Sequence, residues 1–334
     1  MEIEITLPLI LFFMISYLCI CRAENCEGTQ VSHTIVVGHS ANAEFRKVQA
    51  AIDSIPENNS QWVKIHISAG TYMEKVQIPY EKPCIFLEGE GKDVTIITYD
   101  DHQQTDTSAT FSSSPDNVVA TGITFKNTYN VAAMLRFQSR KMGGDDIAPA
   151  LAARVYGDKS AFYECGFIGF QDTLWDVKGR HYFKNCYLEG AVDFIFGNGQ
   201  SYYENCRINA TASGFITAQG RQSEKEESGF VFRDGSVFGN GESLLGRAYG
   251  PYSRVIFYGT NLGSVVAPKG WDAWHYANRE DYIYYAEFGC GGAGANTSNR
   301  VPWMSKLDHS ELKQFSKSEF INQDAWLQKL PLKY

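Results

Sequence analysis

The chain has 334 residues, 44% of them hydrophobic and 14% aromatic, and no Pro/Ser-rich linker or run of charges divides it. We therefore expect one large domain over residues 24–334, following a leader. The formal net charge of −8 argues against a general nucleic-acid binder and against a protein that binds anionic membranes.

The first 23 residues are predicted to be a signal peptide, because residues 5–20 form an apolar run. Its length suits the hydrophobic part of a secretory signal and is short for a membrane span. A signal anchor is the alternative. We expect a secreted mature protein without a membrane segment. Three glycosylation sequons agree with export, at Asn58, Asn209 and Asn296.

The first half of the mature chain predicts short strands and one helix. A strand from His33 is followed by apolar residues at helical spacing from Phe45, a pattern that ends at Pro56. We expect this helix to cap the open end of a stack of strands, where an unpaired edge would invite aggregation. Further short strands are expected within residues 63–67, 85–87, 94–98, 118–125 and 152–156.

One pattern then occurs three times, as AFYECGF at 161–167, YFKNCYL at 182–188 and YYENCRI at 202–208. The intervals between Cys165, Cys186 and Cys206 are 21 and 20 residues. A period near twenty, with short aromatic strands and glycine turns, is typical of a β-solenoid in which each repeat forms one coil. We expect these cysteines to form a buried ladder. A disulfide between two of these cysteines is an open alternative, since neighbouring coils are close enough for it.

The later part of the chain continues this pattern with strands at 230–234 and 254–258. Between the repeat and these strands, the polar segment 219–228 is expected to be an exposed loop. Helices within residues 310–330 are expected to cover the other side of the stack.

Asp172 and Asp193 each lie seven residues after a cysteine of the repeat. Adjacent parallel strands are about 4.8 Å apart, so residues in one phase face each other from neighbouring coils. Either aspartate alone could be structural, as a turn residue or a salt-bridged core residue, but both in one phase predict paired carboxylates. Other chemistries lack their motifs, because no HExxH, Gly-x-Ser-x-Gly, nucleotide-binding or Cys/His zinc pattern occurs.

Four segments closely resemble the signature segments of plant pectin methylesterases: QDTL at 171–174, GAVDFIFG at 190–197, ITAQGR at 216–221 and LGR at 245–247. The resemblance covers nearly all of the mature chain. It implies an all-β fold, a single-stranded right-handed parallel β-helix with capping helices. It also implies hydrolysis of galacturonate methyl esters in pectin. The chain is similar to the shorter class, without an inhibitor-like pro-region.

By this resemblance Asp193 is the nucleophile, Gln171 donates to the developing oxyanion, and Asp172 protonates the departing methanol and then serves as base. Arg247 is expected to keep Asp193 ionised through a two-pronged contact. The expected substrate-binding residues are Thr110, Tyr249, Trp271 and Phe194, with Tyr249 standing where the family usually has tryptophan.

No metal and no cofactor are expected. The expected partner is pectin, as homogalacturonan in the cell wall, and a proteinaceous pectinesterase inhibitor is a further expected partner of a monomeric enzyme. Two alternatives stay open, another β-helix pectin enzyme such as a lyase or a glycoside hydrolase, and a wall protein that binds pectin with weak or no esterase activity.

One position departs from the family pattern. Pro149 stands where the family normally has a glutamine that is a second donor to the oxyanion, and proline has neither a side-chain donor nor a backbone N–H. It lies 22 residues before Gln171 in the sequence, about one coil away. We expect reduced but real activity that depends mainly on Gln171.

Overall fold

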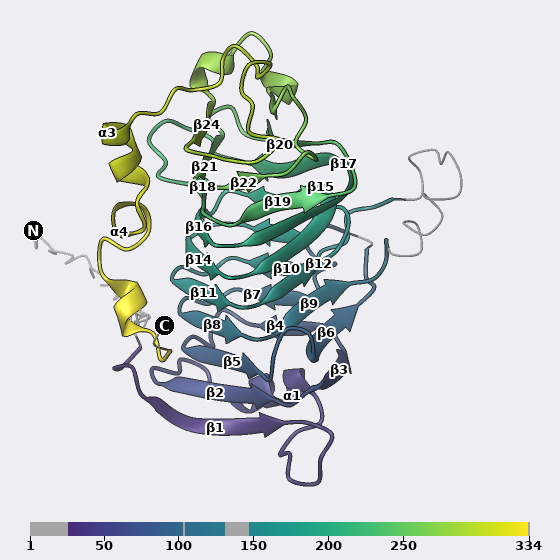
Figure 1. Cartoon of the computed structure of the whole chain (residues 1–334). Helices are drawn as coiled ribbons and strands as arrows, with labels where there is room; N and C mark the ends of the chain where they lie inside the picture. The colour runs from purple at the N-terminus through teal and green to yellow at the C-terminus, as the bar shows by residue number, and fades with distance from the viewer. Residues whose placement is uncertain (1–25, 103, 131–146, 333–334) are drawn as a thin grey trace, which may run out of the picture.

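The computed structural model describes residues 26–102, 104–130 and 147–332. The predicted signal peptide lies outside them. The described residues form a right-handed parallel β-helix in which the chain winds upward from β1 in Figure 1. Every strand pair in these residues is parallel, which agrees with the expected solenoid.

One face of the coils is a ten-stranded sheet to which each coil contributes one strand in chain order. Its strands are β1 (Val31–Val37), β2 (Trp62–Ile67), β5 (Ile85–Gly89), β8 (Val118–Thr121), β11 (Ser160–Tyr163), β14 (Arg180–Lys184), β16 (Gln200–Glu204), β18 (Gly229–Arg233), β21 (Arg254–Tyr258) and β24 (Tyr284–Phe288). The expected strand over 118–125 is interrupted at Gly122, whose φ of 64° turns the chain out of this sheet.

The other two faces belong to a 14-stranded sheet that bends along a corner. Its strands are β3 (Gly70–Met73), β4 (Val76–Ile78), β6 (Thr95–Tyr99), β7 (Phe111–Ser113), β9 (Thr124–Asn127), β10 (Ala153–Val155), β12 (Gly166–Ile168), β13 (Leu174–Asp176), β15 (Tyr187–Gly197), β17 (Arg207–Gln219), β19 (Ser236–Gly239), β20 (Ser243–Ala248), β22 (Asn261–Leu262) and β23 (Trp271–Asp272). The start of β15 pairs with β12 and its end with β13, so this strand runs through the corner.

A second corner follows the ten-stranded sheet and repeats from coil to coil. Glu164, Asn185 and Asn205 all have left-handed backbone there, with φ of 52°, 56° and 53°. The amide of Asn205 donates to the side-chain oxygen of Asn185 over 2.9 Å. Asparagine tolerates this conformation better than most residues, which is why this turn can recur without glycine.

The three cysteines that follow this corner are buried free thiols, so the predicted ladder is confirmed. The Cys186 thiol donates to the carbonyl of the coil before it, and so does that of Cys206. The disulfide of the structure joins Cys26 to Cys84 instead, outside the repeat. The spacing of the cysteines in the sequence did not indicate that pair.

The interior of the stack is filled by aromatic rings, one above another. Phe162, Phe183, Tyr203, Phe232 and Phe257 stack in this order, with ring centroids between 4.5 and 5.0 Å apart. That spacing is close to the separation of parallel strands, about 4.8 Å, so each coil adds one ring to the column. The repeated aromatic residues of the sequence therefore form the core.

Short helices cover the stack where the sequence predicted them. Helix α1 (Val48–Ser54) buries Val48, Ala51 and Ile52 against the first coil. The short helices α3 (His309–Leu312) and α4 (Lys317–Phe320) run beside the ten-stranded sheet (Figure 1). Aromatic residues of this segment, including Phe315 and Trp326, bury the outer side of that sheet.

The segment 219–228 differs from expectation at its ends. Gln219 and Arg221 are buried, because the Gln219 amide oxygen accepts from the backbone N–H groups of Arg221 and Arg254. Only the middle of the segment is exposed.

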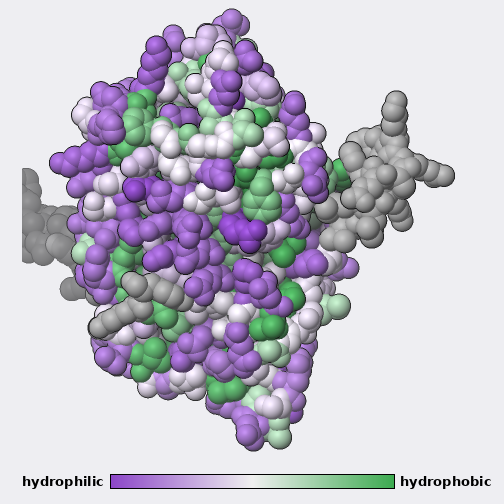
Figure 2. Space-filling model, viewed as in Figure 1, coloured by the Kyte–Doolittle hydropathy of each residue, from purple (hydrophilic) through white to green (hydrophobic). Residues whose placement is uncertain are grey.

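In the described residues no helix is long and apolar enough to cross a membrane. On the face seen in Figure 2, hydrophilic side chains predominate and hydrophobic ones lie in small separate groups.

Candidate functional site

Asp172 and Asp193 occupy the same corner on adjacent coils. Asp172 lies between β12 and β13, and Asp193 lies in β15 where the register with β17 shifts. The N–H of Asp172 donates to the carbonyl of Val192 over 3.0 Å. Both aspartates have left-handed backbone, with φ of 59° and 49°. Such conformations cost about 1–3 kcal/mol in residues other than glycine and concentrate at functional sites.

Arg247 on β20 binds Asp193 with two hydrogen bonds. Its Nε donates to one carboxylate oxygen over 2.7 Å, and its Nη2 donates to the other. The guanidinium also lies between two aromatic rings, 4.4 Å from the centroid of Phe215 and 3.8 Å from that of Trp274. Two rings and a bidentate carboxylate restrict the plane of the guanidinium, so the orientation of the Asp193 carboxylate is restricted as well.

Neither of these aromatic residues was among the predicted site residues. Phe215 directly precedes the ITAQGR segment, so its position was within reach of a motif-based argument. Trp274 begins the short 3-10 helix η2 (Trp274–Tyr276) after the last strand of this face. Its φ of 49° and the bond from its N–H to Asp272 place its ring over Arg247, a turn that no periodicity indicates.

The two carboxylates have different electrostatic surroundings. Burial raises the pKa of Asp193, and the hydrogen bonds and charge of Arg247 oppose that rise. Burial and the negative charge of Asp193 raise the pKa of Asp172 to about 7, with a smaller opposing effect of Arg247. Asp172 therefore retains a proton close to neutral pH, and the arginine contact favours the charged form of Asp193.

Gln171 and Pro149 lie on neighbouring coils, as the sequence interval predicted. Gln171 forms an isolated parallel bridge with Val192, and its carbonyl accepts from the N–H of Ala150 over 3.2 Å. The side-chain amide of Gln171 makes no hydrogen bond to any residue that the structure describes, so it can donate to a ligand. Pro149 directly precedes Ala150 and offers no donor in its place.

The expected substrate-binding residues divide into one exposed residue and three buried ones. Tyr249 is 54% exposed and stacks on Trp274 with a centroid distance of 6.0 Å. Thr110, Phe194 and Trp271 have no exposed surface. The prediction that these three residues contact a sugar therefore does not agree with the structure. Trp271, for example, packs on Tyr285 inside the coil.

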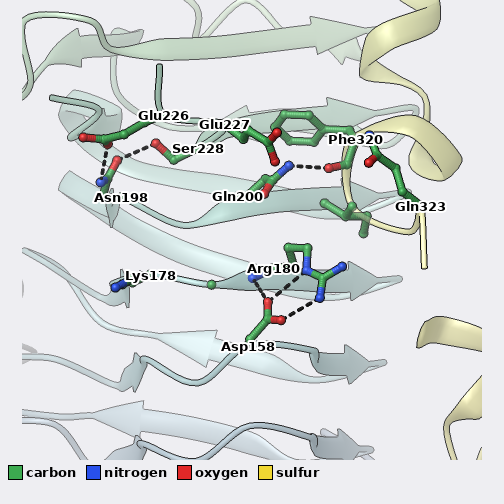
Figure 3. A pocket seen from close by; sticks show the side chains of 12 residues that line it. Asp158, Lys178, Arg180, Asn198, Gln200, Glu226, Glu227, Ser228, Phe320 and Gln323 are labelled. Carbon is green, nitrogen blue, oxygen red and sulfur yellow. Dashed lines mark hydrogen bonds and ion pairs between the residues drawn. The ribbon is translucent and has the colours of Figure 1, made fainter. Parts of the chain in front are cut away.

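A cavity of about 620 Å³ lies away from this site, between the loop after β17 and the C-terminal segment (Figure 3). Its polar side chains are largely bound to one another. Arg180 pairs with Asp158, and Asn198 donates to Glu226. None of the candidate site residues lines this cavity, so we place the functional site at the carboxylate pair.

The donor set at the carboxylate pair does not resemble a metal centre. In the part of the chain that the structure describes, no group of three or more His, Cys, Asp and Glu side chains is arranged to hold a metal ion. The polar groups here are two carboxylates, one amide and one guanidinium. Such a set is suited to acid–base and nucleophilic chemistry.

Comparison with known proteins gives consistent matches. The family model described as Pectinesterase matches residues 34–324. The chain is 46% identical over 315 residues to "Putative pectinesterase 10" of Arabidopsis thaliana, covering 92% of this chain and 90% of that protein. It is 45% identical over 330 residues to "Probable pectinesterase 29" of the same plant, covering 96% and 97%.

Two solved structures are similar over almost the whole chain. The pectin methylesterase from carrot has a TM-score of 0.83 and 30% identity, and the match covers 92% of this chain and 99% of that one. The pectin methylesterase from Aspergillus niger, in deglycosylated form, has a TM-score of 0.77 and 25% identity, with 92% and 100% covered.

Proposed function

Because the chain belongs to the pectinesterase family, we propose that it hydrolyses the methyl esters of galacturonate units in pectin, which releases methanol and leaves free carboxylates. The observation that supports this most is the pair of Asp172 and Asp193 on adjacent coils, with Arg247 bound to Asp193 alone. One carboxyl that retains its proton and one that is held by an arginine are what ester cleavage through an acyl-enzyme needs.

In the proposed first half-reaction, a carboxylate oxygen of Asp193 attacks the ester carbonyl carbon. The carbonyl oxygen becomes an oxyanion, to which the amide of Gln171 donates. As the tetrahedral intermediate collapses, the bond to the methoxy oxygen breaks, and Asp172 gives that oxygen its proton so that methanol leaves. The raised pKa of Asp172 supports this role as acid.

In the second half-reaction, Asp172 is a carboxylate and accepts a proton from water. The hydroxide so formed attacks the galacturonyl carbon of the acyl-enzyme, and the bond to Asp193 breaks. Asp193 leaves as a carboxylate that Arg247 stabilises, and Asp172 is protonated for the next cycle. Protons and electron pairs balance without a cofactor.

We also propose that the mature protein acts outside the cell, in the wall, after removal of residues 1–23. The Cys26–Cys84 disulfide supports this location, because disulfides persist in oxidising compartments. The sequon residues Asn58 and Asn296 are exposed, whereas the Asn209 amide donates to Tyr187 and Glu189. We further propose that the protein is a monomer and that a proteinaceous inhibitor can bind it.

The test is to incubate purified mature protein with highly methylated pectin and to measure three products. We expect methanol, without unsaturated products and without new reducing ends. Unsaturated ends would identify a lyase and new reducing ends a glycoside hydrolase. Binding without any of these products would contradict the proposal and favour the pectin-binding protein.

A further inference from the structure

A row of aligned residues runs along the site-bearing face, parallel to the axis of the stack. The strand register aligns Arg154 with Trp175, Trp175 with Phe196, Phe196 with Ala218, and Ala218 with Arg247. Arg247 at one end of this row belongs to the carboxylate site. Arg154 at the other end has no role in the mechanism above.

Arg154 is a cation without a counterion among the residues that the structure describes. It forms no ion pair and no hydrogen bond with any residue that the structure describes, and its Nε is buried without an acceptor. Its guanidinium lies 5.1 Å from the ring centroid of Trp175 and 5.7 Å from that of Tyr156. A half-buried guanidinium on an aromatic surface, with its donors unused, is ready to bind an anion.

A cavity adjoins this arginine. It has a volume of about 420 Å³, and its lining includes Ser112, Thr107, Lys75 and Asp106 together with Arg154. Lys75 of this lining is itself paired with Asp101 over 2.6 Å. Asp106 is exposed and makes no ion pair with Arg154.

The row from Arg154 to Arg247 is partly apolar. Trp175 and Phe196 stack with a centroid distance of 5.4 Å and pack with Ala218, and of these three residues Trp175 is the one that is partly exposed. The strand of Arg154 lies two strands from that of Asp193, about 10 Å away at about 4.8 Å per strand, and Asp193 precedes Phe196, the aligned residue of its strand, by three positions. A short run of sugar units along the row would connect the two positions.

We propose that Arg154 binds the free carboxylate of a de-esterified galacturonate unit, in the same pectin chain whose ester lies at Asp193. This inference rests on the proposed function. A guanidinium fork matches a carboxylate in geometry and charge, whereas a methyl ester offers only neutral acceptors. Arg154 therefore distinguishes partly de-esterified chains from fully methylated ones.

The test compares wild type with Arg154→Gln on fully methylated oligogalacturonides and on the same oligomers partly saponified with alkali. We expect kcat/KM for methanol release to favour the saponified oligomers in wild type. In Arg154→Gln we expect a loss of about tenfold on these oligomers only, which is the scale of one charged hydrogen-bonding partner. Arg154→Lys retains the charge and should keep part of the preference.

A binding measurement separates this site from the catalytic proposal. Calorimetry with fully de-esterified oligogalacturonate should show about tenfold weaker binding for Arg154→Gln. The control is Arg207→Gln, because Arg207 lies over Phe238 in a similar way, with 5.1 Å to the ring centroid, on another face. Unchanged binding in Arg154→Gln, an equal loss on both substrates, or an equal effect of Arg207→Gln would overturn the inference. If binding depends on Arg154 but no methanol is released, only the proposed esterase activity would be overturned.

Discussion

At the scale of single residues, the protonation of Asp172 controls the proposed chemistry. The carboxyl is buried next to the charge of Asp193, and its pKa is raised to about 7. It is protonated below that value and can act as acid there. The same shift affects stability. Because the folded value lies above the ordinary value of about 3.9, the folded state holds this proton more tightly, and stability decreases as the pH rises from about 4 through about 7.

We therefore predict that kcat/KM for methanol release falls as the pH rises through about 7. A second limb at lower pH should report the ionisation of Asp193. The measurement is initial methanol release from pectin across the acidic and neutral range, with Asp172→Asn as comparison. Any activity left in Asp172→Asn should lack the limb near pH 7. A flat profile in wild type would contradict coupled carboxylates.

Pro149 and Gln171 give a second prediction at this scale. If Gln171 is the main side-chain donor to the oxyanion, Gln171→Ala should lower kcat by about 10²–10³, the usual cost of losing one such donor. Pro149→Gln should raise kcat, because it restores a donor on the neighbouring coil. Both variants need a thermal unfolding control. If Pro149→Gln is folded and no faster, and Gln171→Ala is unaffected, other groups stabilise the oxyanion.

At the scale of elements, three adjacent coils are joined by a buried polar network. Asp176 at the end of β13 contacts His181 Nδ1 on β14 over 2.5 Å and accepts from the Tyr203 hydroxyl on β16 over 2.6 Å. The other ring nitrogen of His181 lies 2.8 Å from the carbonyl of Gly157. Acceptors at both ring nitrogens favour the protonated form of His181, in agreement with the upward direction of its pKa. The network anchors the strand that follows Asp172.

This network predicts a pH-dependent stability. Burial lowers the pKa of His181, but the charge and hydrogen bond of Asp176 and the Gly157 carbonyl raise it by more, and the net shift is upward. The stabilisation is thus complete below the unfolded value of about 6.5 and is lost as the pH rises through the raised folded value.

We expect His181→Ala to lower the free energy of unfolding by about 3–5 kcal/mol at pH 6, because it leaves Asp176 buried and unpaired. The difference from wild type should shrink at higher pH. Chemical denaturation at several pH values measures it, with His33→Ala as control at an exposed histidine. An equal, pH-independent effect of both variants would show that His181 does not carry a buried charge.

At the scale of the whole molecule, the period of the sequence predicted the fold and the carboxylate pair together. Residues at equivalent positions of adjacent coils lie next to each other in a solenoid. The spacing of Cys165 and Cys186 therefore predicted that Asp172 and Asp193 are neighbours. Arg247 came from the resemblance, and the structure brings it to Asp193 from two coils away along the sheet.

Other features lay beyond that reasoning for identifiable reasons. Phe194 was expected at the substrate, but which side chains face inward at its corner depends on the register shift in β15, which alternation does not reveal. Trp271 on the two-residue strand β23 was expected there as well and packs inward on Tyr285. Trp274 belongs to a segment that does not follow the repeat of about twenty residues. The Cys26–Cys84 disulfide joins the chain before β1 to the residue that directly precedes β5, and spacing alone does not determine such a pairing.

The most direct measurement of the central claim is methanol release from highly methylated pectin by Asp193→Ala beside wild type and Asp234→Ala. Asp234 is a matched control, since it also has left-handed backbone, with φ of 55°, and an arginine partner, yet lies outside the site. We predict that Asp193→Ala is folded and releases no more than a trace of methanol, whereas Asp234→Ala releases it at a rate close to that of wild type. More than a trace from folded Asp193→Ala would contradict Asp193 as the nucleophile.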